Sequence, residues 1–421
     1  MLRATTTVII GAGHAGLAMS RRLTERSLDH VVLERGEVAN SWRTERWDSL
    51  RLLTPTWHTR LPGLDAPGDP DGFMAVPAVV SLLDGYARSI GAPVLAGTRV
   101  NRVGVDGDGF TVDTDRGAWR CASVVLATGP ANVAAVPPFA SALPRSIESV
   151  TPLTYRSPAH LADGGVLVVG GSASGVQLAD EIHRSGRPVT LAVGEHVRLP
   201  RTYRGRDIFW WLDAAGVLDE RHDQVDDLTR ARHVPSPQLV GTSDHRSIGL
   251  DTLTELGVDV VGRVGAVRDG VALCSGALAN VCRLADLKLT RLLDRLDGWA
   301  ARAGFDPGHG PDRPAPTVVP RAPVLELDLQ RRGIRTVVWA TGYRPDLSWL
   351  DGPVFDHRGR IRHHGGVVSG APGLYVLGGN LLRTRRSSYI GGAGDDTLAV
   401  AEHLQLHLSR VHRCCAAAAG T

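Results

Sequence analysis

The chain has 421 residues, 43% hydrophobic and 22% charged, a composition typical of globular proteins that excludes disordered and fibrous classes. Its 47 basic and 44 acidic residues are interspersed and give a formal net charge of +3, so the composition indicates no nucleic-acid partner. No apolar stretch is long enough to span a membrane, and no secretory pattern follows Met1. At roughly 100 to 200 residues per domain, we therefore expect a cytoplasmic protein of two or three domains.

A glycine-rich turn near the start has the complete context of a dinucleotide site. Its parts are an apolar strand at residues 7–10, the glycines Gly11, Gly13 and Gly16, a helix at 17–24 and a second strand at 31–34. Gly11 permits the tight turn, Gly13 lets the backbone reach a pyrophosphate, and Gly16 allows the helix to pack closely on the strand. Glu34, with Arg35 beside it, ends the second strand and would accept the ribose hydroxyls of an adenosine.

The same pattern returns in the middle of the chain. An apolar strand at residues 166–169 precedes Gly170, Ser172, Ala173, Ser174 and Gly175, and a helix at 176–184 and a strand at 189–193 follow. Ser172 stands where the middle glycine normally lies, so its side chain obstructs close approach to the diphosphate. The repeat nevertheless predicts a second dinucleotide site.

The residues after the second strand of this repeat favour NADPH over NADH. Val193 occupies the position that matches Glu34, so no carboxylate there would repel a 2′-phosphate. The basic residues of the next loop, whose guanidinium groups would bind that phosphate, are Arg198, Arg201 and Arg204. Glu195 lies close by and is also able to serve a ribose diol, which leaves NADH open as the alternative.

A second internal repeat marks the ends of the two nucleotide-binding halves. It pairs Thr128 and Gly129, after an apolar strand, with Thr341 and Gly342, after another. The α/β pattern therefore predicts two Rossmann-like dinucleotide-binding domains, with the second inserted into the first. Two complete dinucleotide sites on one chain imply a bound flavin in one and a diffusible hydride donor in the other, so we expect an NADPH domain inserted into an FAD domain. We place the first part of the FAD domain at 1–150, the NAD(P)H domain at 151–335, and the return segment of the FAD domain, with a frayed C-terminal tail, at 336–421.

Two segments outside these repeats carry weaker expectations. Residues 282–303 read as an amphipathic helix that packs in the core, with a partner-binding helix as the alternative. Its apolar side chains near helical spacing are Leu284, Leu287, Leu292, Leu296 and Trp299. A proline-rich segment at 306–323 follows, and we expect it to form a surface loop. The chain has five cysteines, at positions 121, 274, 282, 414 and 415, with no C-x-x-C or metal-ligand spacing. We therefore expect no metal site and no disulfide framework, and the spacing disfavours a thiol–disulfide reductase.

Taken together, these motifs resemble the flavin-containing monooxygenases, or class B flavin monooxygenases, over most of the chain. Residues 40–55 look like that family's segment between the first glycine turn and the flavin ring, and residues 201–212, 377–380 and 387–396 are similar to later family segments. The resemblance implies that Trp42 and Arg43 line the FAD site and that Leu53 and Thr54 face the isoalloxazine ring. Thr54 and Arg43 are then the candidate catalytic residues. Trp42 and Trp47 have packing in the core as their alternative role.

The activity implied by the resemblance is an FAD-dependent, NADPH-consuming monooxygenation. One oxygen atom of O2 would pass from a C4a-(hydro)peroxyflavin to a small organic substrate, by nitrogen, sulfur or carbonyl oxidation. The chain departs from the family signature F-x-G-x-x-x-H-x-x-x-Y/F, because Arg145, Ile147 and Thr151 stand where Phe, Gly and His belong and only Tyr155 matches. An NAD(P)H-dependent flavin oxidoreductase or oxidase, and a non-catalytic nucleotide-binding redox sensor, therefore stay as alternatives.

Overall fold

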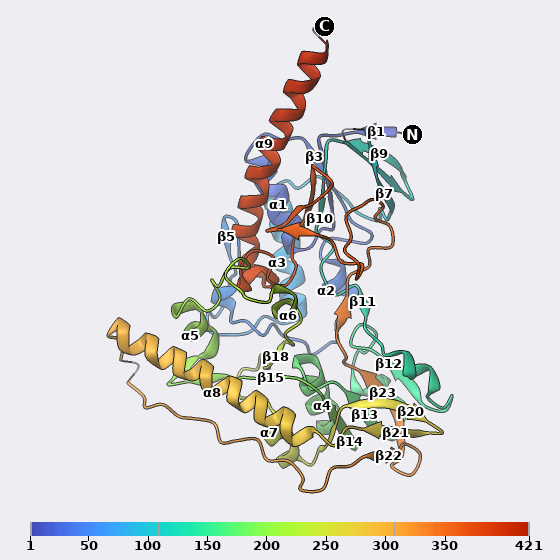
Figure 1. Cartoon of the computed structure of the whole chain (residues 1–421), viewed down its shortest axis with the longest axis vertical. Helices are drawn as coiled ribbons and strands as arrows, with labels where there is room; N and C mark the ends of the chain where they lie inside the picture. Colours follow the sequence, from blue (N-terminus) through green and yellow to red (C-terminus); the bar gives the residue numbers. More distant parts are fainter. Residues whose placement is uncertain (1, 108, 307, 420–421) are drawn as a thin grey trace.

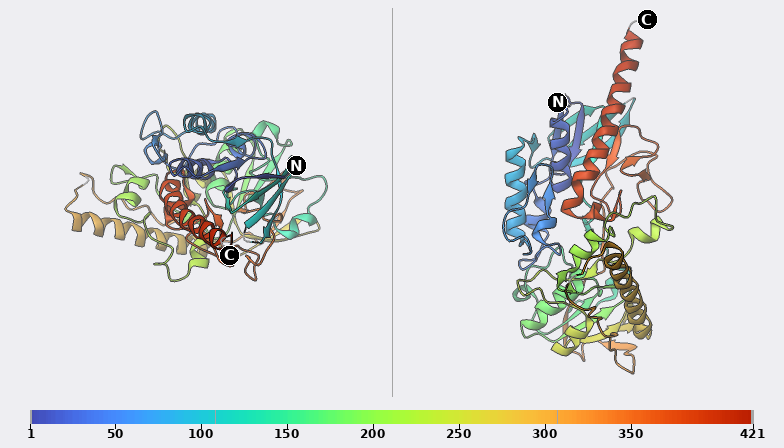
Figure 2. Two further views of the ribbon diagram at one scale, coloured as in Figure 1. Left: turned by 90° about the horizontal axis from the view of Figure 1, so that it is seen from above. Right: turned by 90° about the vertical axis from the view of Figure 1, so that its left-hand side faces the viewer.

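The computed structural model describes residues 2–107, 109–306 and 308–419, with side chains as far as Val411. The molecule is elongated, with two α/β domains stacked along its longest axis (Figure 1). Both chain ends lie at the end formed by the first domain, and the views in Figure 2 agree on this. The predicted fold class, two Rossmann-like domains with the second inserted into the first, is confirmed.

The first domain is built on a seven-stranded sheet. Its strand order is β25(His363–His364), β26(Val367–Val368), β27(Leu374–Val376), β10(Ser123–Leu126), β2(Thr7–Ile10), β3(His30–Leu33) and β6(Val94–Leu95). The strands from β27 to β6 are parallel, and β2 and β10 are completely buried. Continuous apolar strands of this kind need cover on both faces. Among the elements that pack around the sheet are α1(His14–Thr24), α3(Val76–Ser89) and α9(Ala393–Ala419) on one side.

A smaller sheet covers the other face of the first domain. Its strands are β1(Leu2–Ala4), β9(Gly117–Cys121), β8(Gly109–Thr114) and β7(Val100–Asp106). Phe110 and Val112 of β8 pack against Val8 and Val124 of the large sheet, which closes the core. The remaining short elements of this half are α2(Asn40–Thr44), η1(Thr56–His58), β4(Arg60–Leu61) and β5(Leu64–Asp65), and in the return segment η4(Arg385–Ser388) and η5(Ile390–Gly392).

The second domain has a five-stranded parallel sheet. Its order is β12(Glu148–Val150), β23(Ile334–Trp339), β13(Gly165–Val169), β14(Val189–Val193) and β19(Asp259–Gly262). Helices α4(Ala173–Arg184) and α7(Leu250–Leu256) pack on one face, and β20(Val264–Arg268), β21(Val271–Cys274) and β22(Glu326–Asp328) form an antiparallel sheet over the other. A side lobe contains α5(Ile208–Ala214), α8(Leu278–Ala303) and the short strands β15(Val197–Arg198), β16(Thr202–Tyr203), β17(Arg206–Asp207) and β18(Pro237–Gln238). The short helix α6(Leu228–Arg232) contacts the return segment instead, because Arg232 donates to the Leu381 carbonyl.

The chain crosses between the domains in two strands that pair with each other. These are β11(Val133–Ala134) and β24(Tyr343–Arg344), which are antiparallel neighbours. The crossing lies earlier than the predicted boundary at residue 150, because β12 already pairs with β23 inside the second sheet. Two 3-10 helices, η2(Pro138–Ala142) and η3(Pro158–His160), follow the first crossing.

The helix expected at 282–303 is present as α8, but two of its expected core side chains are not buried. Leu284 and Leu287 are 58% and 45% exposed, whereas Leu296 is buried together with Cys282, Leu289 and Leu293. The tail that we expected to fray continues α9 to Ala419, consistent with alanine being the best helix former. No helix in the described part of the chain is long and apolar enough to cross a membrane.

Candidate functional site

The two glycine turns are built in the same way. Gly11 and Gly170 have φ angles of +106° and +118°, which only glycine adopts without strain. A Cβ atom at Gly11 would collide with the carbonyl oxygen of Ala127, and one at Gly170 with that of Ala340. The last glycines repeat the match: a Cβ at Gly16 would collide with the carbonyl of Gly11, and a Cβ at Gly175 with that of Gly170. Each helix therefore packs against its strand at a distance that only glycine allows.

The middle position of each turn is where a ligand has room. A Cβ added at Gly13 would meet no protein atom within 4 Å, so the space in front of it is open. Ser172 takes the same backbone conformation, with φ −87° and ψ −173° against −82° and −176° at Gly13. Because Ser172 makes no side-chain capping hydrogen bond, the first amide groups of α4 stay free for a phosphate, as do those of α1.

Glu34 ties the end of β3 to the first glycine turn. It is 7% exposed, and its two carboxylate oxygens accept hydrogen bonds from the amides of Ala12 and Gly36 at 2.8 and 3.0 Å. A carboxylate offers about four lone-pair sites, so both oxygens retain acceptor capacity for ribose hydroxyls. Arg35 points elsewhere and is ion-paired with Glu45.

Trp42 and Arg43 lie on the short helix α2, between the glycine turn and α3. Trp42 is partly buried against the core of the first domain, and the Arg46 guanidinium lies 5.3 Å from its ring centre. Arg43 donates to the Val38 carbonyl at 2.9 Å and is ion-paired with Asp84 of α3. The structure thus gives Arg43 a role in holding α2 on α3, and its predicted position beside the flavin ring stays a prediction.

Thr54 and Leu53 lie at the junction of the two domains. Thr54 is 7% exposed, and the Leu53 carbonyl accepts a hydrogen bond of 2.8 Å from Arg201 of the second domain. A few residues further on, His58 is 4% exposed, and neither of its ring nitrogens has a hydrogen-bond partner in the structure. Burial, with a smaller contribution from Arg386, lowers the pKa of His58 to about 4, so the imidazole is neutral at pH 7.

Aromatic side chains from three separate segments surround His58. Its ring centre lies 5.5 Å from Trp57, 5.8 Å from Phe209 of α5 and 5.5 Å from Tyr389 of the return segment. Our sequence reasoning missed this cluster, because its members are far apart in the chain. The only available signal was a histidine four residues beyond Thr54 in the segment expected to face the ring.

The return segment brings another unpaired polar atom to the first domain. Asp396, in the first turn of α9, is 2% exposed, and one of its carboxylate oxygens has no partner. Burial raises its pKa to about 6, although a hydrogen bond to Ser387 acts in the opposite direction. The α9 helix packs against α1, which follows the first glycine turn.

The two small polar turns shape the crossings between the domains. Gly129 and Gly342 have φ angles of +77° and +96°. Thr341 donates to the Ala135 carbonyl at 2.8 Å, and the Thr128 carbonyl accepts from Asn132 at 2.8 Å. These contacts fix the start of β11 and β24, so both turns serve the connection between the domains.

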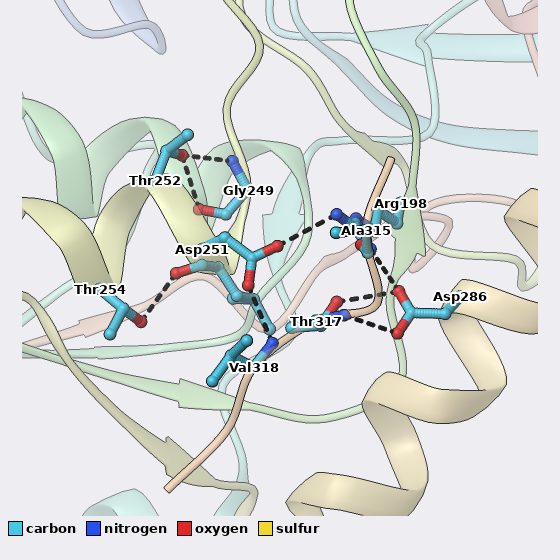
Figure 3. A network of polar contacts seen from close by, with 10 residues as sticks. Arg198, Gly249, Asp251, Thr252, Thr254, Asp286, Ala315, Thr317 and Val318 are labelled. Carbon is cyan, nitrogen blue, oxygen red and sulfur yellow. Dashed lines mark hydrogen bonds and ion pairs between the residues drawn. The ribbon is translucent and has the colours of Figure 1, made fainter. Parts of the chain in front are cut away.

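Arg198, a predicted phosphate ligand, is ion-paired with two carboxylates. Its guanidinium is ion-paired with Asp286 at 2.6 Å and with Asp251 at 3.0 Å (Figure 3). Asp286 also accepts from the amide and hydroxyl of Thr317, each at 2.9 Å, and Asp251 from the amide of Val318 at 3.0 Å. Arg198 therefore helps to hold the loop after α8 against the second domain.

The other two predicted phosphate ligands also have internal partners. Arg201 is 0% exposed and is ion-paired with Asp207 at 2.6 Å. Arg204 is ion-paired with Asp297 at 3.0 Å and donates to the His309 carbonyl at 2.9 Å. The prediction that these arginines bind a 2′-phosphate does not fit the structure, since each guanidinium already neutralises a carboxylate. Spacing along the chain did not reveal these partners.

The segment that departs from the monooxygenase signature has structural roles. Ile147 is buried in the core of the second domain, and the Thr151 amide donates a hydrogen bond of 3.0 Å to the Thr154 hydroxyl, which closes a local turn. Tyr155 is 1% exposed with an unpaired hydroxyl, and burial raises the pKa of that hydroxyl well above its usual value. Nothing at these positions replaces the missing histidine.

Comparisons with known proteins agree with the two-domain architecture. The family of pyridine nucleotide-disulphide oxidoreductases matches residues 8–205. An uncharacterized CzcO-like oxidoreductase of Geobacillus kaustophilus is 30% identical over 394 residues, which cover 92% of this chain and 95% of the relative. The indole-3-pyruvate monooxygenase YUCCA6 of Arabidopsis thaliana is 29% identical over 222 residues, covering 49% and 52%.

A solved structure shows the same fold. A flavin-containing monooxygenase from Stenotrophomonas maltophilia superposes with a TM-score of 0.67 at 18% identity, covering 96% of this chain and 99% of that one. The CzcO-like relative matches nearly its whole length, and the predicted resemblance is confirmed. The chain therefore belongs to the family of CzcO-like oxidoreductases, and its fold is that of a flavin-containing monooxygenase.

Proposed function

We propose that the protein is an FAD-dependent, NADPH-consuming monooxygenase that acts on a small organic substrate with O2. The observation that carries this proposal is the pair of matching glycine turns, one in each domain. One site suits a resident dinucleotide and the other a diffusible one, with their reactive rings meeting where the domains join. The monooxygenase names of the YUCCA relative and of the Stenotrophomonas neighbour support oxygen transfer as the activity.

The residues of the first domain fit FAD. The open space before Gly13 suits a diphosphate, and the amides at the start of α1 would bind it. Glu34 would hold the adenosine ribose through its remaining lone pairs. FAD, when bound, supplies the redox chemistry, taking a hydride from the coenzyme and passing electrons to O2.

The junction of the domains fits the site of reaction. Thr54 and Leu53 would border the flavin, and the cluster around His58 would exclude water from it. The neutral His58 offers one nitrogen donor and one acceptor without a protein partner, so it would hydrogen-bond a polar group of the substrate or of reduced oxygen. Cytoplasmic location stays a prediction.

The alternative is an NAD(P)H-dependent oxidase or reductase without oxygen transfer. It is favoured by the missing signature, since Ile147 and Thr151 do not supply the glycine and histidine of the family. Transfer of electrons to a disulfide is less favoured. The cysteines with described side chains, Cys121, Cys274 and Cys282, are all buried. Burial raises the thiol pKa of Cys121 to about 12 and that of Cys282 to about 11, so neither is a thiolate at pH 7.

Rapid mixing tests the proposal. The purified flavoprotein is reduced anaerobically with NADPH and mixed with oxygenated buffer, while flavin absorbance and hydrogen peroxide are followed. A monooxygenase should show an absorbing species between the reduced and oxidised spectra, with peroxide appearing only as that species decays. Immediate return to the oxidised spectrum with stoichiometric peroxide, with and without a panel of amines, sulfides and ketones, would identify an oxidase.

A further inference from the structure

A basic side chain without a protein partner lies at the edge of the second sheet, next to the glycine turn. Strands β14 and β19 are parallel neighbours with Val193 opposite Gly262, so Gly194 and Arg263 leave the sheet side by side. The glycine turn after β13 leaves at the same edge, because the Gly170 amide donates to the Ala192 carbonyl of β14 at 2.9 Å. The turn, Gly194 and Arg263 therefore follow three adjacent strands in order.

The stem of Arg263 lies against Gly194. The Cβ, Cγ and Cδ atoms of Arg263 lie 3.8, 3.7 and 3.6 Å from the point where a Cβ of residue 194 would be, so the arginine stem runs along the bare glycine. Arg263 is exposed, and within the described parts of the chain its guanidinium has no hydrogen bond or ion pair. This distinguishes it from Arg198, Arg201 and Arg204, which are all paired with carboxylates.

The loop at 194–201, which follows β14, contains one carboxylate, and that carboxylate is neutralised by the only lysine of the chain. Glu195 follows Gly194 and accepts a hydrogen bond of 2.9 Å from Lys288 of α8. The hydrogen bond and charge of Lys288 lower the pKa of Glu195, so the carboxylate is ionised at pH 7 and its charge is balanced. With Arg263 added, the end of β14 carries a net positive charge.

We infer that Arg263, assisted by Lys288, forms the subsite for a phosphomonoester on the 2′ position of the coenzyme ribose. In dinucleotide-binding folds the end of the second strand lies at the adenosine ribose, and a nearby arginine accommodates the 2′-phosphate. A guanidinium binds a phosphate through two parallel hydrogen bonds. The inference rests on the proposed assignment of this turn to NADPH, and it replaces the arginines that the sequence suggested with residues from β19 and α8.

Ligand binding tests the subsite without any turnover. Isothermal titration calorimetry of the purified flavoprotein with 2′,5′-ADP and with 5′-AMP should show tighter binding of 2′,5′-ADP. Arg263→Gln should weaken 2′,5′-ADP by about tenfold or more, the range expected for lost charge-assisted hydrogen bonds, and leave 5′-AMP unchanged. The matched control is Arg268→Gln, which removes the same charge from an exposed arginine at the other end of β20.

A second set of variants tests the role of Lys288. Lys288→Gln should weaken 2′,5′-ADP by exposing the charge of Glu195, and adding Glu195→Gln should restore the affinity. In anaerobic flavin reduction, Arg263→Gln should raise the NADPH concentration needed for half-maximal rate, with the limiting rate and the NADH reaction unchanged.

The inference is overturned if the wild-type protein binds 2′,5′-ADP no more tightly than 5′-AMP, or if Arg263→Gln and Arg268→Gln behave alike. These outcomes are independent of oxygen transfer. An enzyme that only releases peroxide would contradict the proposed monooxygenation while leaving the NADPH subsite intact.

Discussion

At the scale of single residues, the glycines of one turn do different physical work. A Cβ at Gly16 would collide with the backbone of Gly11, whereas a Cβ at Gly13 would meet only open space. Gly16 is required by packing, whereas Gly13 is required only if a ligand comes close to the backbone. Substitution at the two positions therefore separates folding from binding.

We predict that Gly13→Ala folds normally but retains little FAD after purification. The added methyl group contacts no protein atom, so the thermal midpoint of the flavin-free protein should stay within a few degrees of the wild type. The same methyl group would lie where the diphosphate approaches, so the ratio of flavin to protein absorbance should fall several-fold. Gly16→Ala is the contrast and should reduce soluble expression. Full flavin content in Gly13→Ala would show that the first turn does not bind the dinucleotide.

The residue scale also shows what sequence reasoning reached and where it stopped. Local rules identified the backbone roles of Gly11, Gly16, Gly170 and Gly175, because a turn between strand and helix requires them wherever the rest of the chain lies. Arginine roles depend on partners distant in sequence. Arg198 meets Asp286, which is 88 residues away, and no spacing rule predicts that pair.

At the scale of elements, the segment from α2 to η1 belongs to both domains. Trp47 is 5% exposed and lies in the core of the second domain, although it precedes that domain by about one hundred residues. Arg156 donates to the Arg46 carbonyl at 2.9 Å, and its own carbonyl accepts from the Asp48 amide at 3.0 Å. The alternative role predicted for Trp47, packing in a core, is thus correct, but the core is that of the second domain.

We predict that Trp47→Ala uncouples the two domains. Removing a buried tryptophan should cost about 3–5 kcal/mol, and the loss falls on the contact between the domains. Urea unfolding followed by flavin and tryptophan fluorescence should change from one transition to two, with the second domain unfolding first. Trp119→Ala is the control, since Trp119 is a partly buried residue of β9 in the first domain. A single transition in Trp47→Ala would contradict this account.

Helix α8 shows why element-scale sequence reasoning is incomplete. The predicted helix is present, but leucines occur on both of its faces, so periodicity alone did not identify the buried one. The buried face is the one that carries Leu289 and Leu293, because these leucines pack against a group of aromatic residues. The aromatic residues are Tyr203, Phe209 and Trp211. Those aromatic residues come from α5 and β16, whose position no local pattern fixes.

At the scale of the whole molecule, the domains meet through many polar contacts in addition to Trp47. Arg385 is ion-paired with Glu220, and Arg386 with Asp219 and Asp213, joining the return segment to the second domain. The backbone amide of His222 also donates to the Arg383 carbonyl at 2.9 Å. The duplication in the sequence predicted two domains, but it held no information on this interface, because the contacts come from segments outside the repeats.

Two buried groups at or near this interface, His58 and Asp396, affect the stability of the protein, and their effects depend on pH in opposite ways. The pKa of His58 is lowered by burial from 6.5 to about 4, so the unfolded chain binds more protons and stability falls as the pH drops through that window. The pKa of Asp396 is raised by burial from 3.8 to about 6, so the folded protein binds more protons and stability falls as the pH rises through that window. The contributions of His58 and Asp396 to stability therefore have opposite signs as the pH changes between about 4 and 6.

Single variants should therefore reveal each effect. His58→Phe keeps an aromatic ring beside Phe209 and Tyr389 and removes the titration, so its stability relative to wild type should improve by up to about 3 kcal/mol between pH 7 and pH 4.5. Asp396→Asn should show the opposite dependence: its stability relative to wild type should increase as the pH rises from 4.5 to 7. The measurement is the urea midpoint of each protein across this range. Parallel pH profiles for the two variants would contradict the assignment, because burial of a neutral imidazole and burial of a carboxylate must act with opposite signs.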